Sequence, residues 1–302
     1  MKAVVLHEYG GPEKLMYEDV PDPTADEGQV LVRVAASSVN PIDFKIRSGK
    51  MKAYFPMEFP AILGRDISGI VRAVGSDETG FKMGDKVMAL GNKAYAELAV
   101  VAAKDVALVP DGLDLVKAAA LPLVTSTGEQ LISKGTRIEA GQTVLVSGAL
   151  GGVGRSAVWT AKKAGAKVIA GVKKSQMKEA ATLGADQVLA LDDATAMDKL
   201  GFIDAIADTV GGEIAEKLLG KVKQGGVFAS VLGPPANSAM HPTVKVEAVV
   251  ARPDAATLRT MAEDVAAGRF VIPIDRMVPL AEAGKAQSAA ENGGVGKILL
   301  LA

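Results

Sequence analysis

Short runs of apolar and β-branched residues alternate with Gly, Pro and Asp over the first third of the chain. Runs of this length between turn residues are typical of β-strands. Gly84-Asp85 and Gly91-Asn92 predict tight connections between strands, because Gly and Asn adopt positive φ at little cost. We expect an antiparallel barrel or sandwich whose main strands are residues 30–34, 67–71, 86–90 and 95–101.

From Leu121 onward, apolar runs alternate with stretches that have helical spacing. Val153, Ala157 and Ala161 recur on one helix face, and Gly165 follows as a helix-ending residue. Strands that alternate with helices pair in parallel and are apolar on both faces. We therefore predict an α/β protein with a doubly wound parallel sheet, whose strands are residues 143–147, 167–172, 187–191, 203–208 and 226–231.

The end of the chain combines a polar, helix-like stretch at residues 280–291 with a final apolar strand at residues 297–302. The pattern leaves open which of the two regions this strand completes. The length of 302 residues exceeds the usual size of a single hydrophobic core, so we expect two domains.

Composition and charge narrow the classes of function. With 49% hydrophobic and 23% charged residues, the chain can build folded cores and a polar exterior. The formal net charge is −1 and no run of Lys or Arg exceeds two residues, which excludes the basic surface of a nucleic-acid-binding protein. We expect a small-molecule partner instead.

The chain contains no cysteine, which excludes disulfides, thiolate nucleophiles and cysteine-ligated metal sites. The apolar run at the N-terminus is too short for a secretory signal, and no run reaches the ~20 apolar residues of a membrane-spanning helix. We expect a cytoplasmic protein with no membrane partner. The motifs of serine hydrolases, P-loop kinases and HExxH metalloproteases are also absent from the sequence.

A glycine-rich turn follows the first predicted parallel strand. Its pattern, Ala149-x-Gly151-x-x-Gly154 with Gly152 and Val153 inside, matches the dinucleotide-binding fingerprint except that Ala replaces the first Gly. In that fingerprint the backbone approaches the pyrophosphate, which binds at the helix N-terminus. The turn alone also fits a strand-to-helix connection without a ligand, but the four parallel strands that follow favour dinucleotide binding.

The residues after the second predicted parallel strand indicate which dinucleotide binds. An enzyme specific for NAD places Asp or Glu there, on the ribose 2′-hydroxyl. This chain has Lys173, Lys174 and Ser175, followed by Lys178. Ammonium groups and a hydroxyl suit a 2′-phosphate, so we predict NADPH. Alternatively these lysines are simply solvated, and Arg155 either reaches the pyrophosphate or lies in solvent.

Further motifs occur in a fixed order along the chain. They are Met1-Lys2-Ala3 with Gly10-Gly11-Pro12-Glu13, Asn40-Pro41-Ile42-Asp43, the segments 64–71 and 121–127, and Gly296-Lys297. With the glycine turn, this set resembles the medium-chain dehydrogenase/reductases, in their zinc-free quinone oxidoreductase (zeta-crystallin-like) branch, nearly from end to end. The resemblance implies a Rossmann doubly wound parallel sheet, residues 123–269, inserted in a GroES-like β-rich catalytic domain, residues 1–122 and 270–302.

The resemblance also implies roles for individual residues. Asn40 and Thr127 correspond to residues beside the nicotinamide, Val153 to one beside the pyrophosphate, and Asp208 to the turn beneath the adenosine half. The strand end that would flank the nicotinamide ring is Ala229, Ser230, Val231 and Leu232. For the active site we predict Asn40, Asp43, Arg65, Tyr54 and Thr127. The proton source stays open between Tyr54, Lys45 and water.

For several of these residues, a purely structural role is the alternative to a role in catalysis. Asn40 would simply cap a turn before Pro41, and Asp43 would hold a backbone turn. Arg65 would pair with the neighbouring Asp66. Tyr54 would serve as packing in a lid or core.

Zinc-dependent relatives carry Cys and His where this chain has residues 40–43 and Arg65, and its only histidines are His7 and His241. A catalytic zinc needs about three protein ligands, so we expect no metal. Acceptors that need little polarisation are then favoured, and we predict NADPH-dependent hydride transfer to a quinone or an α,β-unsaturated carbonyl. The alternatives are an enoyl-thioester or enal reductase, and an NADPH-binding sensor or structural protein with little turnover. As in the family, we predict a homodimer, joined at an edge strand within residues 244–250.

Overall fold

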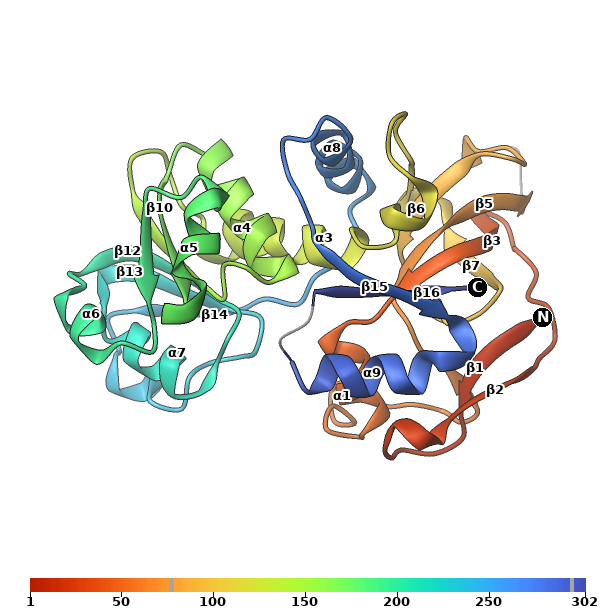
Figure 1. Ribbon diagram of the computed structural model, residues 1–302, viewed down its shortest axis with the longest axis horizontal. Helices are drawn as coiled ribbons and strands as arrows, with labels where there is room; N and C mark the ends of the chain where they lie inside the picture. Colours follow the sequence, from red (N-terminus) through yellow and green to blue (C-terminus); the bar gives the residue numbers. More distant parts are fainter. Residues whose placement is uncertain (76–78, 294–295) are drawn as a thin grey trace. The chain divides into compact units, whose positions relative to one another are not determined.

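The computed structural model describes residues 1–75, 79–293 and 296–302. The chain divides into two compact units (Figure 1). Unit 1 comprises Met1–Leu123 and Pro253–Ala302, and unit 2 comprises Val124–Arg252. The three segments follow the order expected from the sequence, but the chain returns to unit 1 at residue 253 rather than at residue 270.

Helix α8 (Ala255–Ala266) accounts for this earlier return. It contacts strand β8 (Val106–Leu108) of unit 1 and buries Leu258, Met261 and Ala262. The spacing of its apolar residues is that of any amphipathic helix, so the sequence pattern does not tell which unit the helix joins.

The larger sheet of unit 1 is built around the long strand β3 (Gln29–Ser38). Across the sheet the order is β15 (Ile274–Pro279), β16 (Lys297–Leu301), β3, β5 (Asp66–Val74), β6 (Lys86–Leu90) and β8, and β7 (Leu98–Ala102) also pairs with β3. All neighbours are antiparallel except β15 and β16. The last strand of the chain therefore completes unit 1, which the sequence pattern left open.

Alternate side chains of these strands form an apolar core. Val30, Val32 and Val34 of β3 belong to the same buried cluster as Ile67 and Val71 of β5, as the period of two in a strand requires. Strand β6 has the predicted bounds, whereas β7 begins three residues later than predicted.

A smaller sheet of unit 1 contains β1 (Lys2–Leu6), β2 (Leu15–Asp19) and β4 (Ala61–Ile62). This sheet is not predicted from the sequence. Strand β2 is largely exposed and β4 has only two residues, so neither has a clear apolar pattern. Helices α1 (Pro41–Arg47) and α9 (Ala283–Glu291) lie side by side (Figure 1) and share a core cluster, and α2 (Leu115–Ala118) is a short helix.

Unit 2 contains a six-stranded sheet in which every strand pairs in parallel with its neighbours. The order is β11 (Gln187–Ala190), β10 (Lys167–Val172), β9 (Thr143–Ser147), β12 (Ile203–Asp208), β13 (Val222–Ser230) and β14 (Lys245–Ala248). This is the order of doubly wound dinucleotide-binding folds. The predicted α/β fold class is confirmed, and β9, β10 and β12 have the predicted bounds.

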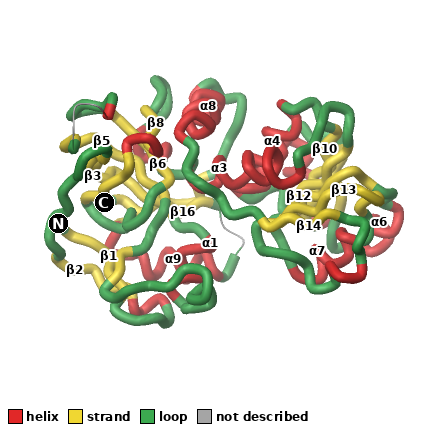
Figure 2. The backbone as a smooth tube through the Cα atoms, turned by 180° about the vertical axis from the view of Figure 1, so that it is seen from behind, coloured by secondary structure: helices red, strands yellow, loops and turns green. Residues whose placement is uncertain are grey.

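Helices cover both faces of this sheet, with α4 (Gly152–Lys163) on one side and α7 (Gly212–Leu219) on the other (Figure 2). Val144 of β9 is in one core cluster with Ala157 of α4, whereas Leu145 is in another with Leu218 of α7. Both faces of the strand are therefore buried, which explains its unbroken apolar sequence. The remaining helices are α3 (Pro122–Gln130), which continues into a π-helical turn at Leu131–Thr136, α5 (Met177–Ala180) and α6 (Ala194–Lys199).

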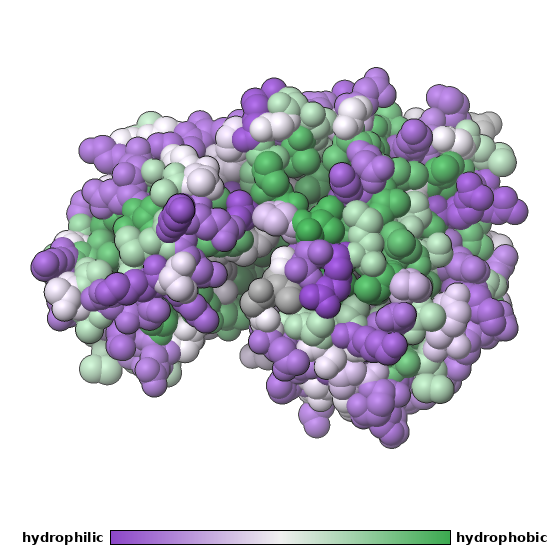
Figure 3. Space-filling model, viewed as in Figure 1, coloured by the Kyte–Doolittle hydropathy of each residue, from purple (hydrophilic) through white to green (hydrophobic). Residues whose placement is uncertain are grey.

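No helix in the described part of the chain has the length and apolar composition needed to cross a membrane. On the face drawn in Figure 3, hydrophilic side chains cover much of the surface of each unit, with smaller apolar areas between them.

Candidate functional site

The glycine turn of unit 2 follows β9, beside the point where the strand order reverses. Gly148 has a φ of +65°, and a Cβ there would lie 2.4 Å from the Thr209 hydroxyl. Gly148 therefore makes the tight turn for which the fingerprint uses its first glycine, one residue before Ala149. Ala149 is fully buried in the core, and its N–H donates to the Gly171 carbonyl. The side chain of Ala149 therefore packs inside the unit, and its cofactor contact stays a prediction.

The other glycines allow α4 to begin against this turn. A Cβ on Gly154 would lie 2.1 Å from the Gly148 carbonyl oxygen, so only glycine fits. Gly151, the exposed N-cap, is less crowded, because a Cβ there would lie 3.3 Å from the same oxygen. Among the described residues, the backbone N–H groups of Gly152 and Val153 have no hydrogen-bond acceptor. The turn thus offers free donors at the positive end of a helix dipole, an arrangement that suits phosphate.

Asp208 joins three strand ends around the turn. It is fully buried, and its two carboxylate oxygens accept hydrogen bonds from the hydroxyls of Ser147 and Ser230, each at 2.7 Å. The N–H groups of Val210 and Gly211 donate to the same carboxylate at 3.1 Å. Because both oxygens are occupied, Asp208 positions the loops after β9, β12 and β13. The predicted contact of Asp208 with the cofactor stays a prediction.

The four residues at the strand end 229–232 differ in burial. Ala229 and Ser230 are fully buried, so they act through the packing and hydrogen bonds of the sheet. Val231 is half-buried, and Leu232 is 44% exposed. Of the four residues predicted to flank the nicotinamide, only Val231 and Leu232 have side chains at the surface of unit 2.

Helix α3 brings Thr127 beside the glycine turn. A Cβ on Gly128 would lie 2.4 Å from Ser156 Cβ and 2.6 Å from the Val153 carbonyl oxygen. A Cβ on Gly152 would likewise lie 2.8 Å from a methyl of Val124. This close packing fixes Thr127, which is 8% exposed, next to the first turn of α4.

The residues predicted to bind a 2′-phosphate follow β10, next to β9. Lys173, Lys174, Ser175 and Lys178 are all exposed. The ammonium group of Lys174 forms an ion pair with Asp193 at 3.0 Å, which the sequence analysis does not anticipate. Among the described residues, the Lys173 ammonium group forms no ion pair. It is therefore free to bind an anion.

Arg155 forms two contacts within unit 2. Its guanidinium donates to the Leu150 carbonyl at 3.0 Å and to the Glu179 carboxylate at 2.6 Å. Arg155 therefore connects the glycine turn to α5, and it does not lie free in solvent.

In unit 1, the predicted residue Asn40 is at the centre of a buried polar cluster. Its Nδ2 donates to the Asp66 carboxylate at 2.8 Å, and its Oδ1 accepts from the Lys297 ammonium group at 2.5 Å. Ser38 donates to Asp66 and accepts from Lys297. Asn40 is only 1% exposed. In the sequence, Lys297 belongs to the Gly296-Lys297 motif, and nothing in that motif predicts this cluster.

Asp43 caps the start of α1. Its Oδ2 accepts from the Asn40 N–H at 2.8 Å and from the Tyr95 hydroxyl at 2.9 Å. Burial raises the pKa of the Asp43 carboxyl to about 7, although both hydrogen bonds favour the ionised form. Burial also raises the pKa of Tyr95 well above its usual range, so this phenol stays protonated as a donor. The structural alternative for Asp43 agrees with these contacts, whereas the Asn40 side chain bonds to Asp66 and Lys297 and makes no cap hydrogen bond to the turn.

Arg65, Tyr54 and Lys45 lie outside this cluster of hydrogen bonds. Arg65 donates to the Gly91 carbonyl at 2.8 Å and does not form the local ion pair with Asp66 that was considered. Tyr54 is 78% exposed, so it is not core packing. Burial, with a smaller effect of Lys50, lowers the pKa of Lys45.

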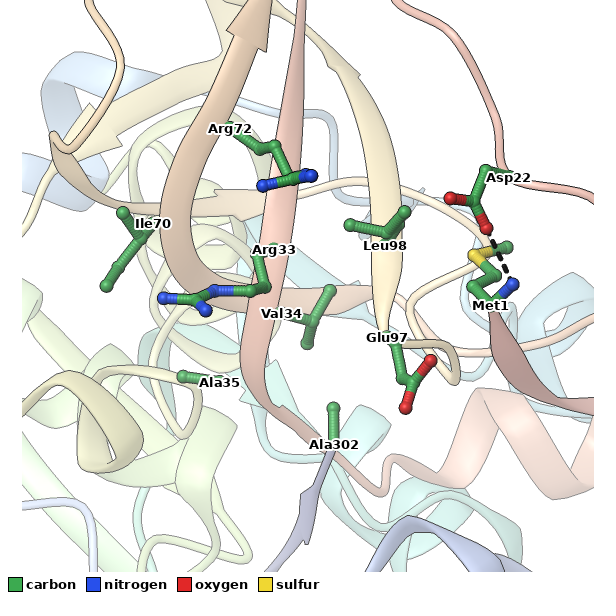
Figure 4. A pocket seen from close by; sticks show the side chains of 10 residues that line it. All are labelled: Met1, Asp22, Arg33, Val34, Ala35, Ile70, Arg72, Glu97, Leu98 and Ala302. Atoms are coloured by element: carbon green, nitrogen blue, oxygen red, sulfur yellow. Dashed lines mark hydrogen bonds and ion pairs between the residues drawn. The ribbon is translucent and has the colours of Figure 1, made fainter.

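A hollow of about 600 Å³ lies on the outer side of the larger sheet of unit 1 (Figure 4). It contains none of the predicted site residues. Arg33 and Arg72 line it together with Asp22 and Glu97, so positive and negative groups balance and the hollow does not select a ligand of one charge.

Two family models match the chain. The alcohol dehydrogenase GroES-like domain matches residues 26–111, and the zinc-binding dehydrogenase model matches residues 183–300. The solved structure of a protein from Mycobacterium abscessus, described as a probable oxidoreductase, is 30% identical, with a TM-score of 0.80 over 100% of this chain and 99% of that one. The chain belongs to the medium-chain dehydrogenase/reductase superfamily.

Within this superfamily the chain is similar to quinone and enone reductases. The quinone oxidoreductase from Coxiella burnetii has a TM-score of 0.89 at 28% identity, over 100% of this chain and 99% of that one. The NADPH-dependent alkenal/one oxidoreductase of Arabidopsis thaliana chloroplasts is 33% identical over 77% of this chain and 63% of its own length. The chain spans between 54% and 63% of the length of the curated relatives that it matches.

The name of the second family model refers to zinc, but the donor set of this chain differs from a zinc site. By the family resemblance, residues 40–43 and Arg65 stand where zinc-dependent members have ligands, and these positions supply neither Cys nor His. Among the described residues, no three His, Asp or Glu side chains lie close enough together to hold a metal ion.

Proposed function

We propose that this protein is a reductase that uses NADPH to reduce a quinone or an α,β-unsaturated carbonyl compound. The glycine turn of unit 2 carries the proposal, because its free N–H groups begin a helix beside the strand-order reversal of a doubly wound sheet. The names of the similar proteins from Coxiella burnetii and Arabidopsis thaliana support the substrate class.

The residues of the turn fit the pyrophosphate of a dinucleotide. Gly151 is exposed, whereas the positions of Gly148 and Gly154 leave no room for a side chain. The N–H groups of Gly152 and Val153 would donate to phosphate oxygens. Thr127, held against the first turn of α4, would contact the nicotinamide half. When bound, NADPH supplies the hydride for the reduction.

The lysines after β10 support NADPH over NADH. The Lys173 ammonium group would bind the 2′-phosphate directly. Lys174 would exchange its exposed ion pair with Asp193, which contributes little stability, for the doubly charged phosphate. Ser175 would add a hydroxyl donor, and Lys178 would add positive charge.

In unit 1 we assign Lys45 as the proton source and Asn40 and Asp43 as positioning residues. The lowered pKa of Lys45 makes its ammonium group a better acid than an ordinary lysine at neutral pH. Tyr54 is 78% exposed, and among the described residues its hydroxyl has no hydrogen-bond partner, so we rank it below Lys45. Arg65 keeps free N–H groups beyond its bond to Gly91, and it would stabilise a developing oxyanion.

A panel of acceptors tests this function. NADPH oxidation is followed with benzoquinone, phenanthrenequinone, a simple enone and an enoyl thioester, and NADH is used in parallel. We expect turnover with the quinones or the enone, and a lower KM for NADPH than for NADH. Preference for the thioester would identify an enoyl reductase instead. Tight NADPH binding without turnover of any acceptor would identify a sensor or structural protein and refute the proposal.

We also propose a homodimer joined at β14. This strand forms one end of the six-stranded sheet and pairs only with β13, so its outer edge is available to a second copy. A cytoplasmic location remains our proposal for the compartment.

A further inference from the structure

Lys297 brings a positive charge into the interior of unit 1, and the roles assigned above do not use it. The side chain is 8% exposed. Its ammonium group donates to Ser38 Oγ at 2.6 Å and to Asn40 Oδ1 at 2.5 Å, and it lies 3.2 Å from Asp66 Oδ2. A buried charge costs stability even when it is paired, so an apolar residue would serve a purely structural purpose at least as well.

The contacts of Lys297 fix the orientation of the Asn40 amide. An ammonium group has only donors, so it must meet the amide oxygen and not the amide nitrogen. The amide nitrogen is then left to donate to Asp66, as observed at 2.8 Å. Without Lys297, the amide would be free to rotate by half a turn or to leave the cluster.

The same network reaches helix α3. Asp66 Oδ1 accepts the backbone N–H of Leu123, in the first turn of α3, at 2.6 Å. Lys297 thus holds, through Asp66 and Asn40, the start of α3 and the corner between β3 and α1.

We propose that Lys297 is a positioning residue for the reduction, acting through the side chains of Asn40 and Asp66. This inference rests on the proposed function, because its effect is expected on the chemical step. It assigns Lys297 no contact with substrate or cofactor. The glycine turn belongs to unit 2, so loss of Lys297 should leave NADPH affinity almost unchanged while turnover falls.

A double-mutant cycle tests whether Lys297 acts through Asn40. Lys297→Met, Asn40→Ala and the double variant are compared in kcat, in KM for NADPH and in NADPH affinity by fluorescence. We expect Lys297→Met to lower kcat roughly a hundredfold at unchanged NADPH affinity. In the Asn40→Ala background the same change should have almost no further effect on kcat. Lys285→Met, which removes a lysine that is 82% exposed, is the matched control and should behave as the wild type.

Lys297→Met leaves Asp66 as an unpaired buried charge, so this variant can fail to fold. A pair of variants without the Asp66 charge keeps the test valid in that case. Asp66→Asn is then compared with the double variant Asp66→Asn/Lys297→Met. A further fall in kcat of roughly tenfold supports positioning. Equal kcat values in this pair, or additive effects in the first cycle, would overturn the proposal.

A measurement without turnover separates this inference from the proposed function. The side-chain amide resonances of Asn40 are assigned by their loss in Asn40→Ala, and their hydrogen exchange is followed by NMR. We expect slow exchange in the wild type and fast exchange in Lys297→Met, or in the charge-balanced double variant. Unchanged exchange would refute the positioning role, whereas a wild type inactive with every acceptor would refute only the proposed reaction.

Discussion

Ser147 donates a 2.7 Å hydrogen bond to the buried carboxylate of Asp208, and this contact joins the carboxyl ends of β9 and β12 beside the glycine turn. Replacing Asp208 by Ala would leave Ser147, Ser230 and two backbone N–H groups without their buried acceptor. We expect Asp208→Ala to lower the free energy of unfolding by about 3 kcal/mol, measured by urea denaturation, and to weaken NADPH binding. Asp198→Ala, at an exposed position on α6, should leave both quantities unchanged.

The close contact of Gly154 with the Gly148 carbonyl leads to a second prediction. Gly154→Ala would place a methyl group 2.1 Å from that oxygen, so the turn and the helix must separate. We expect a loss of at least about 2 kcal/mol of stability and no measurable NADPH binding by calorimetry. The control is Gly201→Ala, where a Cβ would meet no atom within 4 Å. Normal NADPH affinity of Gly154→Ala would contradict the role given to this turn.

Charge reversal tests the 2′-phosphate assignment. Lys173→Glu should raise the KM for NADPH roughly tenfold or more and leave the KM for NADH nearly unchanged, because only NADPH carries the phosphate. Lys174→Glu should act in the same direction. Lys199→Glu, on the exposed side of α6, is the control for a general change in surface charge. An equal effect of Lys173→Glu on both cofactors would contradict the assignment.

The raised pKa of Asp43 predicts a pH-dependent contribution to stability. The folded protein holds the Asp43 proton up to about pH 7, whereas the unfolded chain releases it near its ordinary value of 3.8. The stabilisation from this group is therefore complete below pH 3.8 and is lost as the pH rises to about 7. Asp43→Asn keeps an oxygen that can accept from Asn40 and Tyr95 but cannot ionise.

Urea denaturation as a function of pH checks this prediction. Relative to the wild type, Asp43→Asn should gain stability by up to about 1.4 kcal/mol per pH unit between pH 4 and 7, and the difference should level off above that range. Asp66, Lys297 and Tyr95 are the titratable groups facing Asp43, and all are retained in the variant. A stability difference independent of pH would show that Asp43 ionises normally.

The edge position of β14 predicts the oligomeric state. Size-exclusion chromatography with light scattering should give twice the chain mass of 31.0 kDa at micromolar concentration. A monomer at that concentration would refute the proposed dimer.

The sequence predicts unit 2 well because its signals are local. Strands buried on both faces give unbroken apolar runs, and glycines mark the turn, so β9, β10 and β12 are found with their correct ends. The role of Gly148 is missed because it depends on a positive φ and on the nearness of Thr209, neither of which is visible in the spacing of the motif. Likewise, the carboxylate of Asp193 meets Lys174 only through the pairing of β10 with β11.

The polar cluster of unit 1 is harder to predict because its members are far apart in the sequence. Lys297 and Asn40 are separated by 257 positions, and they meet only because β16 pairs with the end of β3. The family resemblance identifies Asn40 and Asp43 as candidate site residues, but it does not indicate that both side chains are buried. The exposed β2 has no apolar pattern, so it too becomes visible only through its pairing with β1.

Transfer of a labelled hydride from NADPH to the acceptor is the most direct test of the proposed reduction. The protein is supplied with NADPH deuterated at the transferable C4 position and with an enone or a quinone, and the products are analysed by mass spectrometry and NMR. With the enone, we predict one deuterium at the β-carbon of the reduced product. With the quinone, we predict stoichiometric formation of hydroquinone and NADP, with a primary isotope effect on kcat. Absence of any reduced product, with NADPH bound and unconsumed, would contradict the proposed reduction.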